Sequence, residues 1–267
     1  MSKARTIAIS NQKGGVAKTT TAVNLAGILA EKGKRVLIVD ADAQANATNA
    51  LGINDNELEE TLIDLLCLYE DPKHYKNFNR DTVHRFIVKT EWNIDVLPSS
   101  ITLSDVDRKI GNALGREDIL YEILSEVKDD YDYIIIDCPP SLGLMCLSAL
   151  VASDYIVIPI YPSFFSVKGL QQLMALVETV QRKVNQNLKV MGFCITKYDK
   201  RVKQHSMIAE EFENVDKFGY KTFSCIIRTN AEIEKAQSNQ KPINIYNKDC
   251  NGYIDYENLT MEVLNYE

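Results

Sequence analysis

The first part of the chain limits the fold more than any other feature of the sequence. A short β-rich run over Thr6–Ile9 precedes a glycine-containing loop, and from Lys18 apolar residues recur at helical spacing until Gly33. Arg35–Asp40 is a second run that is almost wholly apolar, which is typical of a strand buried on both faces of a parallel sheet. This order of strand, loop, helix and strand predicts an α/β fold.

The loop, which we call the phosphate loop, reads Asn-Gln-Lys-Gly-Gly-Val-Ala-Lys-Thr-Thr over residues 11–20. Gly14 and Gly15 let the backbone turn its N–H groups inward as an anion nest, and the positive end of the following helix points at the same place. Lys18 can reach the β- and γ-phosphates of a nucleotide, and the Thr19 hydroxyl can bind Mg²⁺. We therefore predict a nucleotide site formed by Gly14, Gly15, Val16, Ala17, Lys18, Thr19 and Thr20.

Two further segments place carboxylates at the ends of apolar strands. Residues 40–48 read Asp-Ala-Asp-Ala-Gln-Ala-Asn-Ala-Thr and follow the second strand, at the edge where doubly wound sheets bind ligands. Tyr133–Ile136 is a third buried strand and ends in Asp137, the arrangement that supports Mg²⁺ in P-loop enzymes. These carboxylates would otherwise only cap the helices that follow them.

The rest of the chain continues the α/β alternation. We expect strands near Ile94–Pro98, Tyr155–Ile160 and Val190–Thr196, and helices near Arg116–Lys128, Ser166–Asn185 and Val202–Glu213. Residues 53–92 are the least regular, and we expect helices and loops packed on one edge of the sheet. The 267 residues, with 45% hydrophobic content, can bury one large core. The prediction is a single P-loop NTPase domain over residues 1–267, with a mostly parallel central sheet flanked by helices on both faces.

Taken together, these motifs resemble the ParA/Soj partition ATPases, which belong to the deviant Walker A NTPases together with MinD and the nitrogenase iron protein. The resemblance extends over nearly the whole chain. It rests on residues 11–21, 40–48, 137–143, 195–201 (Ile-Thr-Lys-Tyr-Asp-Lys-Arg), 234–238 (Glu-Lys-Ala-Gln-Ser) and 241–243 (Lys-Pro-Ile). No one of these segments is specific for the family, but the set is.

The resemblance implies a role for each charged residue of the site. Lys13 would be the signature lysine that crosses the interface of an ATP-bound homodimer and contacts the partner's nucleotide, so that hydrolysis depends on assembly. Asp42 would position or deprotonate the attacking water, and Lys18 would bind the phosphates. Asp40 and Asp137 would ligate Mg²⁺ with Thr19 or support its ligands. The implied activity is slow, partner-stimulated hydrolysis of ATP to ADP and phosphate.

The sequence departs from the family pattern at three small residues. Ala17 stands where the family usually has glycine before the P-loop lysine. A left-handed backbone at Ala17 would cost about 1–2 kcal/mol, and its Cβ would crowd the phosphates. Ala43 and Ala45 replace the usual proline and glycine of the second segment. We expect weaker nucleotide affinity and an altered rate of loop switching, with the Asp42 carboxylate retained.

The charge is distributed unevenly along the chain. The net charge is −7, but residues 182–248, which we call the basic segment, contain 13 Lys/Arg against 7 Asp/Glu. In the family this region binds DNA without sequence preference, through phosphate contacts that weaken steeply with salt. The residues predicted to contact DNA are Lys197, Lys200, Arg201, Lys203, Arg228, Lys235 and Lys241. Glu232 stands where the family has a basic residue, so a merely solvated surface stays an alternative.

The resemblance also implies partners and a location. ATP binding would form a homodimer on nonspecific DNA, and a centromere-binding ParB-like protein would stimulate hydrolysis and release. The chain has no N-terminal extension for a helix-turn-helix, no signal peptide and no long apolar run, so we expect a cytoplasmic, nucleoid-associated protein that does not bind membrane.

Two other functions stay open. A MinD-like ATPase would position a membrane or protein cargo, but the amphipathic stretch Tyr253–Leu264 is acidic, whereas anionic lipid favours Lys and Arg. We expect this stretch to pack on the body of the protein. A switch for a conjugative or phage element with another cargo is the second alternative.

An iron–sulfur reductase is not supported by the cysteines. The six cysteines show no Cys-x-x-Cys spacing and lie mostly in apolar surroundings, so we expect reduced thiols. Cys138 follows Asp137 without the flanking glycines of a cluster site.

Overall fold

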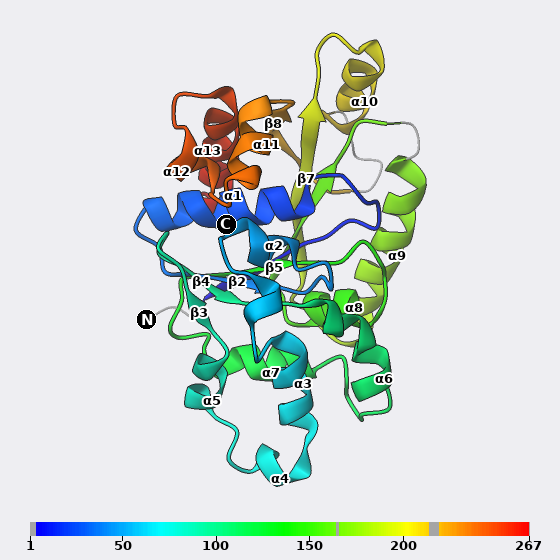
Figure 1. The fold of residues 1–267 in the computed structure, drawn as a ribbon. Helices are drawn as coiled ribbons and strands as arrows, with labels where there is room; N and C mark the ends of the chain where they lie inside the picture. The colour runs from blue at the N-terminus through cyan, green and yellow to red at the C-terminus, as the bar shows by residue number, and fades with distance from the viewer. Residues whose placement is uncertain (1–3, 164–165, 214–218, 267) are drawn as a thin grey trace.

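The computed structural model describes residues 4–163, 166–213 and 219–266. Eight strands form one sheet in the order β3-β4-β2-β5-β1-β6-β7-β8 (Figure 1). All neighbouring strands are parallel except β3 and β4. The strands are β1 Arg5–Ile9, β2 Val36–Asp40, β3 Val88–Lys89, β4 Ile94–Leu97, β5 Tyr133–Asp137, β6 Tyr155–Ile160, β7 Lys189–Tyr198 and β8 Thr222–Arg228. The predicted fold class is confirmed.

Side chains alternate between two cores, one on each face of the sheet. In β2, Leu37 and Val39 face one core while Val36 and Ile38 face the other, and all four are buried. This double burial explains why the strand is continuously apolar. The core that contains Leu37 is completed by α3 Leu62–Glu70, α7 Ile119–Ser125, α8 Leu144–Val151 and α9 Ser166–Lys183. The opposite core is completed by α1 Lys18–Glu31, α11 Ala231–Ser238, α12 Ile243–Tyr246 and α13 Asn251–Leu264.

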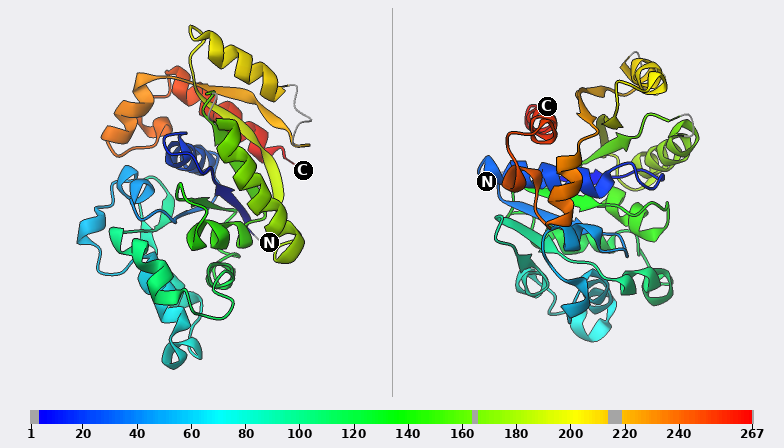
Figure 2. Two further views of the ribbon diagram at one scale, coloured as in Figure 1. Left: turned by 90° about the vertical axis from the view of Figure 1, so that its right-hand side faces the viewer. Right: turned by 45° about the horizontal axis from the view of Figure 1, so that its top comes forward.

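Helices therefore cover both faces, as Figures 1 and 2 show. In the view of Figure 1, α1 and α13 lie above the middle of the sheet, and α3 and α7 lie below it. One helix, α10 Lys203–Glu213, extends from the top of the molecule beyond the rest of the fold (Figure 2). Short helices connect the larger elements: α2 Asn46–Ala50, α4 Pro72–Tyr75, α5 Arg80–Arg85 and α6 Val106–Ile110, with single 3₁₀ turns at Asp55–Glu57 and Ile101–Asp105.

The structure differs from the sequence-based expectations in the least regular regions. Residues 53–92 were expected at one sheet edge, but α3 lies under the sheet, where Leu62 and Leu65 are fully buried. Only the two-residue strand β3 extends the edge itself. The helix expected over Arg116–Lys128 is confined to α7, because turns occupy both of its ends. The expected helix over Tyr253–Leu264 is α13, which lies against α1 and β8 and fully buries Tyr256.

Candidate functional site

The sheet topology brings the predicted site together at the carboxyl ends of three neighbouring strands. The central one, β5, lies between β1 and β2. Its last residue, Asp137, pairs in register with Ile9 at the end of β1 and with Asp40 at the end of β2. The phosphate loop leaves β1 at Ile9, so it begins beside both carboxylates. Segments separated by more than ninety residues therefore meet at one edge of the sheet.

The phosphate loop has the conformation that exposes backbone donors. Gly15 has φ +75°, and Ala17 has φ 66° and ψ 34°, both in the left-handed region. Ala17 is the N-cap of α1 but supplies no side-chain cap, so no side chain of the cap satisfies the first N–H groups of the helix. Together with the positive end of a 14-residue helix, these donors form an anion site. The strain anticipated at Ala17 is present in the backbone.

Two buried polar side chains that the sequence analysis did not single out fix this loop. The Asn11 Nδ2 donates to the Pro159 carbonyl at 2.7 Å, and the Asn11 Oδ1 accepts from the Lys13 N–H at 2.9 Å. Thr196, at the end of β7, donates its hydroxyl to the Val16 carbonyl at 3.0 Å. Asn11 and Thr196 both lie within the quoted motifs, but only the neighbouring strands reveal what they bind.

Lys18 is folded into the loop rather than extended into solvent. Its residue is 7% exposed, and its Nζ lies 3.4 Å from the Lys13 carbonyl oxygen, to which it donates. The Lys13 ammonium instead donates from Nζ to the Ser163 hydroxyl at 2.5 Å. The two lysines of the phosphate loop therefore have separate surroundings, although they are five positions apart.

The two strand-end carboxylates have different partners. Asp40 is fully buried and accepts from the Asp42 N–H at 3.2 Å and from both the N–H and hydroxyl of Thr48 at 2.8 Å. Asp137 is also fully buried, yet neither of its oxygens has a hydrogen-bond partner within the described residues. Burial first, and then the charge of Asp40, raise the pKa of Asp137 well above its usual range, against the opposing effects of the nearby Thr19 hydroxyl and the Lys18 ammonium.

An unpartnered buried carboxylate beside a P-loop threonine fits a divalent cation. Carboxylate and hydroxyl oxygens are the ligands that Mg²⁺ prefers, and an ion there would give the Asp137 carboxylate a partner. Asp137 and Thr19 are therefore the residues suited to hold Mg²⁺. The Asp40 oxygens accept hydrogen bonds from Asp42 and Thr48. This fits a role in supporting the Mg²⁺ ligands and not in binding the ion directly.

Asp42 heads a tight turn next to this carboxylate pair. Its Oδ1 accepts from the Gln44 N–H at 3.0 Å, and its carbonyl accepts from the Ala45 N–H at 3.0 Å. Ala45 then caps α2 in the left-handed conformation, with φ 51° and ψ 32°. Both alanines that replace family glycines, Ala17 and Ala45, thus stand where glycine would be unstrained. The positive φ at both positions accounts for glycine in the family, and nothing in the structure explains the two alanines of this chain.

A cavity of about 590 Å³ joins the loop to the C-terminal part of the chain. Thr20 is held there, because the Gln237 amide donates to its hydroxyl at 2.7 Å. Lys197 also lies on the cavity wall and has φ 50°. The lining residues are Gly14, Gly15, Ala17, Lys18, Thr19, Thr20, Asp42, Gln44, Asn46, Asn49, Ala50, Pro140, Lys197, Gln237, Ser238 and Gln240. Gln237 belongs to the quoted Glu-Lys-Ala-Gln-Ser motif, whose contact with the loop the sequence did not predict.

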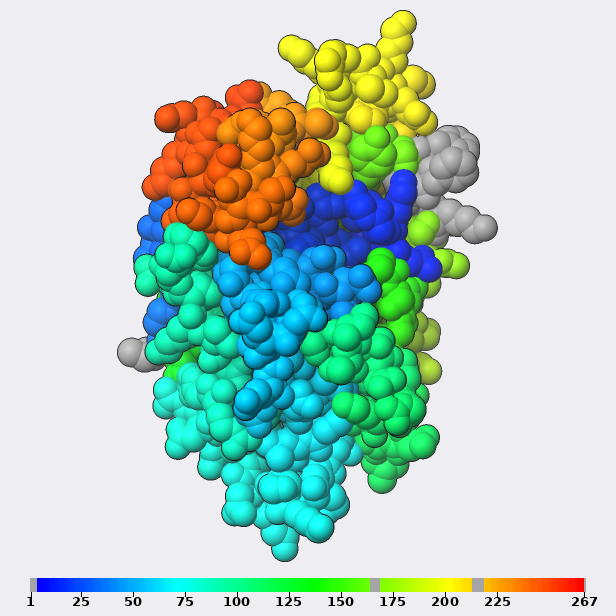
Figure 3. Space-filling view, viewed as in Figure 1, coloured from blue at the N-terminus to red at the C-terminus, as the bar shows by residue number. Residues whose placement is uncertain are grey.

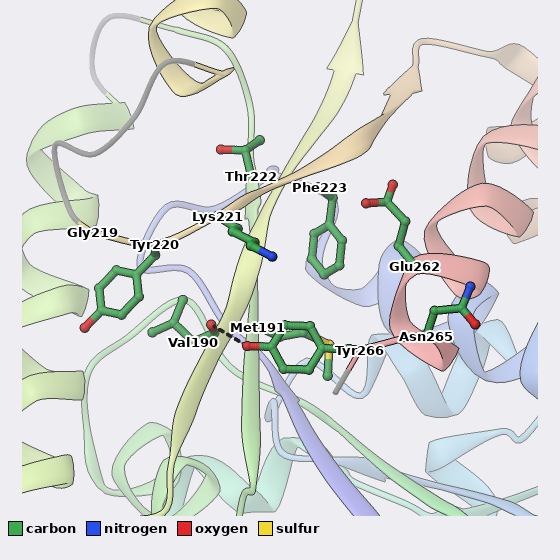
Figure 4. Close-up of a pocket in the computed structure, with 10 residues that line it drawn as sticks. All are labelled: Val190, Met191, Gly219, Tyr220, Lys221, Thr222, Phe223, Glu262, Asn265 and Tyr266. Atoms are coloured by element: carbon green, nitrogen blue, oxygen red, sulfur yellow. Dashed lines mark hydrogen bonds between the residues drawn. The ribbon is translucent and has the colours of Figure 1, made fainter.

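A second cavity of about 590 Å³ is unrelated to this site (Figure 4). It lies where the start of β8 meets β7 and the end of α13, and Tyr266 donates its hydroxyl across it to the Val190 carbonyl at 3.5 Å. None of the predicted site residues lines it.

The basic residues predicted to contact DNA occupy two parts of the upper surface. Lys200, Arg201 and Lys203 lie at the base of α10, whereas Arg228, Lys235 and Lys241 lie around α11. In Figure 3 the orange surface that includes α11 lies to the left of the dark blue surface that includes the phosphate loop, and the yellow surface of α10 lies above it.

Several of these cations are already engaged within the protein. Arg228 forms an ion pair of 2.6 Å with Asp255, Arg201 one of 2.7 Å with Asp199, and Lys235 one of 2.7 Å with Glu232. The Lys241 ammonium lies 5.5 Å from the ring centroid of Trp92. Lys197, Lys200 and Lys203 are exposed.

The cysteines agree with the expectation of free thiols. All six are unbridged, and Cys138 is fully buried. Burial raises the pKa of its thiol well above the ordinary value. Within the described residues no group of three or more His, Cys, Asp or Glu side chains is arranged to hold a metal ion.

The geometry of the loop and its carboxylates has counterparts in known proteins. A family model described as an AAA domain matches residues 4–190. The sporulation initiation inhibitor protein Soj of Bacillus subtilis (strain 168) is 40% identical over 257 residues, which cover 96% of this chain and 97% of that protein. The chain belongs to the ParA/Soj family of ATPases. The chromosome partitioning protein ParA of Caulobacter vibrioides is 37% identical over 98% of this chain and 95% of that protein. The resemblance inferred from the motifs is confirmed.

Solved structures agree with membership of the ParA/Soj ATPases. A cobyrinic acid a,c-diamide synthase from Mycobacterium smegmatis, with a bound ATP analogue and magnesium, is 28% identical with a TM-score of 0.83 over 98% of this chain and 94% of that chain. A putative plasmid partition protein from Borrelia burgdorferi bound to AMPPNP is 26% identical, with a TM-score of 0.76 over 98% and 99%. The cell division ATPase MinD of Pyrococcus furiosus is 25% identical, with the same TM-score and coverage.

Proposed function

We propose that this ParA/Soj ATPase is an ATP-dependent dimerising switch for plasmid or chromosome partitioning. Its ATP-bound dimer holds nonspecific DNA, and a centromere-binding, ParB-like partner stimulates hydrolysis and so releases the DNA. The supporting observation is that the phosphate loop, Asp42 and the unpartnered carboxylate of Asp137 meet at one edge of the sheet. The place of action would then be the cytoplasm, on the nucleoid.

Each group has a separate task in this proposal. The first N–H groups of α1 and the Lys18 ammonium bind the β- and γ-phosphates of ATP. Mg²⁺, when bound, offsets phosphate charge, and Thr19 and Asp137 would hold it. Asp42 orients the attacking water, because its side chain lies beside the cavity on a turn anchored to Asp40. Lys13 of one protomer supplies positive charge to the nucleotide of a second copy.

Asp40 connects these tasks within the protomer. It accepts hydrogen bonds from both Asp42 and Thr48, so it ties the two ends of the segment over residues 42–48 to β2. Ser99, which follows β4, donates its N–H to the Thr48 hydroxyl at 3.1 Å and ties the same segment to the neighbouring strand. A change at the γ-phosphate would therefore reach the surface near the Ile101–Asp105 turn through these hydrogen bonds.

DNA binding in this proposal depends on the exposed lysines of the basic segment. Lys197, Lys200 and Lys203 are the candidates, since Arg201, Arg228 and Lys235 pair with carboxylates. Three lysines per protomer make few contacts with DNA phosphates. Strong binding therefore needs a dimer, in which the phosphate contacts of both copies act on one duplex.

A MinD-like membrane role gains little support. The face of α13 that contains Tyr256 and Leu259 is buried against α1 and β8, so it is not available to lipid. Among the described residues, no helix combines the length and the apolar character needed to cross a bilayer.

The test is binding of the purified full chain to random-sequence duplex DNA with ATP, ADP or no nucleotide, at low and moderate salt. Asp42→Ala holds the ATP state. We expect binding only with ATP, and a strong fall in affinity with salt. Dimerisation with ATP but no DNA binding in any state would favour a MinD-like cargo. Absence of ATP-dependent dimerisation would overturn the switch itself.

A further inference from the structure

The main chain of Lys13 is held by a hydrogen bond. Its side chain can bind either residues of its own chain or, in the proposed dimer, the nucleotide of a second copy. Its N–H donates to Asn11, which is itself buried and bound to the Pro159 carbonyl. These hydrogen bonds position the Lys13 main chain, so the reach of its ammonium toward a second protomer depends on where the side chain points. In the structure it points at residues of its own chain.

Two residues at the end of β6 hold the Lys13 ammonium. The Ser163 hydroxyl accepts from Nζ at 2.5 Å, and Nζ lies 5.4 Å from the centroid of the Tyr161 ring. The first is a hydrogen bond to a charged group and the second has the geometry of a cation–π contact. Tyr161 follows Ile160, the last residue of β6, and Ser163 lies two positions further on. The Ser163 N–H donates to the Tyr161 carbonyl at 2.8 Å, so the two residues form one compact turn.

The position of the Tyr161 ring is set by the base of α10. The ring packs edge-on against His205, with centroids 5.3 Å apart and an interplanar angle of 80°. His205 is 6% exposed, and its Nδ1 accepts from the Asp199 N–H at 3.0 Å. A cavity of about 490 Å³ lies beside this group and separates Gly15 of the phosphate loop from α10. Lys13, Tyr161 and Ser163 are all partly buried, so the Lys13 contact lies at the border between this packed group and solvent.

We propose that Ser163 and Tyr161 act as a latch that holds Lys13 against its own protomer and thereby sets how readily it is presented to a second copy. This inference rests on the proposed role of Lys13 at the nucleotide of the partner protomer. One ammonium cannot occupy both positions, so each dimer that uses Lys13 in this way first breaks the contacts with Ser163 and Tyr161. Ser163 and Tyr161 are positioning residues, because they act through Lys13.

The first experiment measures the latch without any dimer. Competitive labelling with an amine-reactive ester, at low protein concentration without nucleotide, gives the reaction rate of Lys13 relative to other lysines by mass spectrometry. We expect Ser163→Ala to raise the Lys13 rate about threefold, because a charge-assisted hydrogen bond no longer protects the ammonium. Ser163→Thr, which keeps the hydroxyl, and the remote Ser125→Ala should leave the rate unchanged. An unchanged rate in Ser163→Ala would overturn the latch.

The second experiment measures assembly in the Asp42→Ala background with ATP and Mg²⁺. Ser163→Ala should tighten the dimer about fivefold by sedimentation, and Tyr161→Leu should act in the same direction, because each removes a contact that competes with dimerisation. Tyr161→Phe keeps the ring and should leave the dimer unchanged. In a chain that also carries Lys13→Ala, the effect of Ser163→Ala should disappear, which a merely structural role would not produce.

The outcomes separate the latch from the proposed function. If Asp42→Ala with ATP forms no dimer, the switch fails while the labelling result still stands. If it forms a dimer that Ser163→Ala weakens or leaves unaltered, the switch holds and the latch is wrong. If Ser163→Ala tightens the dimer equally with and without Lys13, the residue acts by another route and the latch is again wrong.

Discussion

The phosphate loop and the basic segment differ in how much of their predicted function depends on the tertiary structure. The loop is one continuous run of residues whose backbone and two lysines form the site, so its chemistry survives in any fold that keeps a strand before it and a helix after it. The basic segment is a sum of charges, and folding gives several of them a carboxylate partner, as with Arg228 and Asp255. A local motif thus predicts a site, whereas a charge count predicts only a candidate surface.

The largest expected effect tests whether Asp42, beside the phosphate loop, takes part in catalysis. Asp42→Ala should bind ATP normally and lower the hydrolysis rate about a thousandfold, because it removes the group that orients the water. The measurement is phosphate release at saturating ATP, with nucleotide affinity determined separately. Normal turnover would move the catalytic role away from Asp42. Asp71→Ala, which removes the N-cap of α4 at the far end of the molecule (Figure 1), is a control for general loss of activity.

The next effect concerns nucleotide affinity. Lys18→Ala should weaken ATP binding about a hundredfold, since a buried ammonium that contacts phosphate contributes ~3 kcal/mol. Calorimetric titration with ATP measures it. Lys13→Ala is the matched control, because it changes the other lysine of the loop and should leave the affinity within a factor of about two. Equal losses of ATP affinity in both variants would contradict the assignment of phosphate binding to Lys18 alone.

The third prediction concerns a basic residue whose charge folding has already paired. Arg228→Ala should lower the free energy of unfolding by ~2 kcal/mol, because it leaves the buried Asp255 carboxylate without its cation. Denaturant unfolding measures the loss. Arg228→Ala combined with Asp255→Asn should recover most of the stability. DNA affinity that falls while stability stays the same would show that Arg228 contacts DNA after all.

A smaller effect is expected from the exposed lysines. Lys200→Ala with Lys203→Ala should weaken DNA binding in the ATP state about tenfold at low salt and reduce the salt slope, because two phosphate contacts per protomer are lost. Stability should not change. Lys183→Ala with Lys189→Ala is a matched double control outside this surface. The same loss in both pairs would mean that only the net charge matters.

The smallest effect tests strain in the loop. Ala17→Gly should raise the free energy of unfolding by about 1 kcal/mol, because glycine adopts φ near +66° without a Cβ clash. Thermal unfolding without nucleotide measures it. The same change at Ala30, in regular helix, should instead lower stability by about 1 kcal/mol. If both changes destabilise, the left-handed alanine is not strained.

Most of the strands and the nucleotide edge were predictable from the sequence. The continuous apolar run Val36–Val39 is typical of a central strand, since both faces of such a strand are buried. The edge strands β3 and β8 were missed, because an edge strand has a mixed pattern and β8 alternates buried with exposed residues irregularly. Helix α3 does not lie at the sheet edge expected for residues 53–92, because nothing local to α3 reveals that its leucines lie under the sheet.

The sequence by itself determined the phosphate loop, the carboxylates at the strand ends and membership of the family, because each depends on residue type at fixed spacing. Only the tertiary structure decided that Asp40 is occupied by Thr48 while Asp137 is left for a cation, and that Arg228 is paired with Asp255. It likewise decided that Lys13 lies against Ser163, 150 positions away. Such partners are chosen by the packing of distant strands, and spacing along the chain carries no record of that packing.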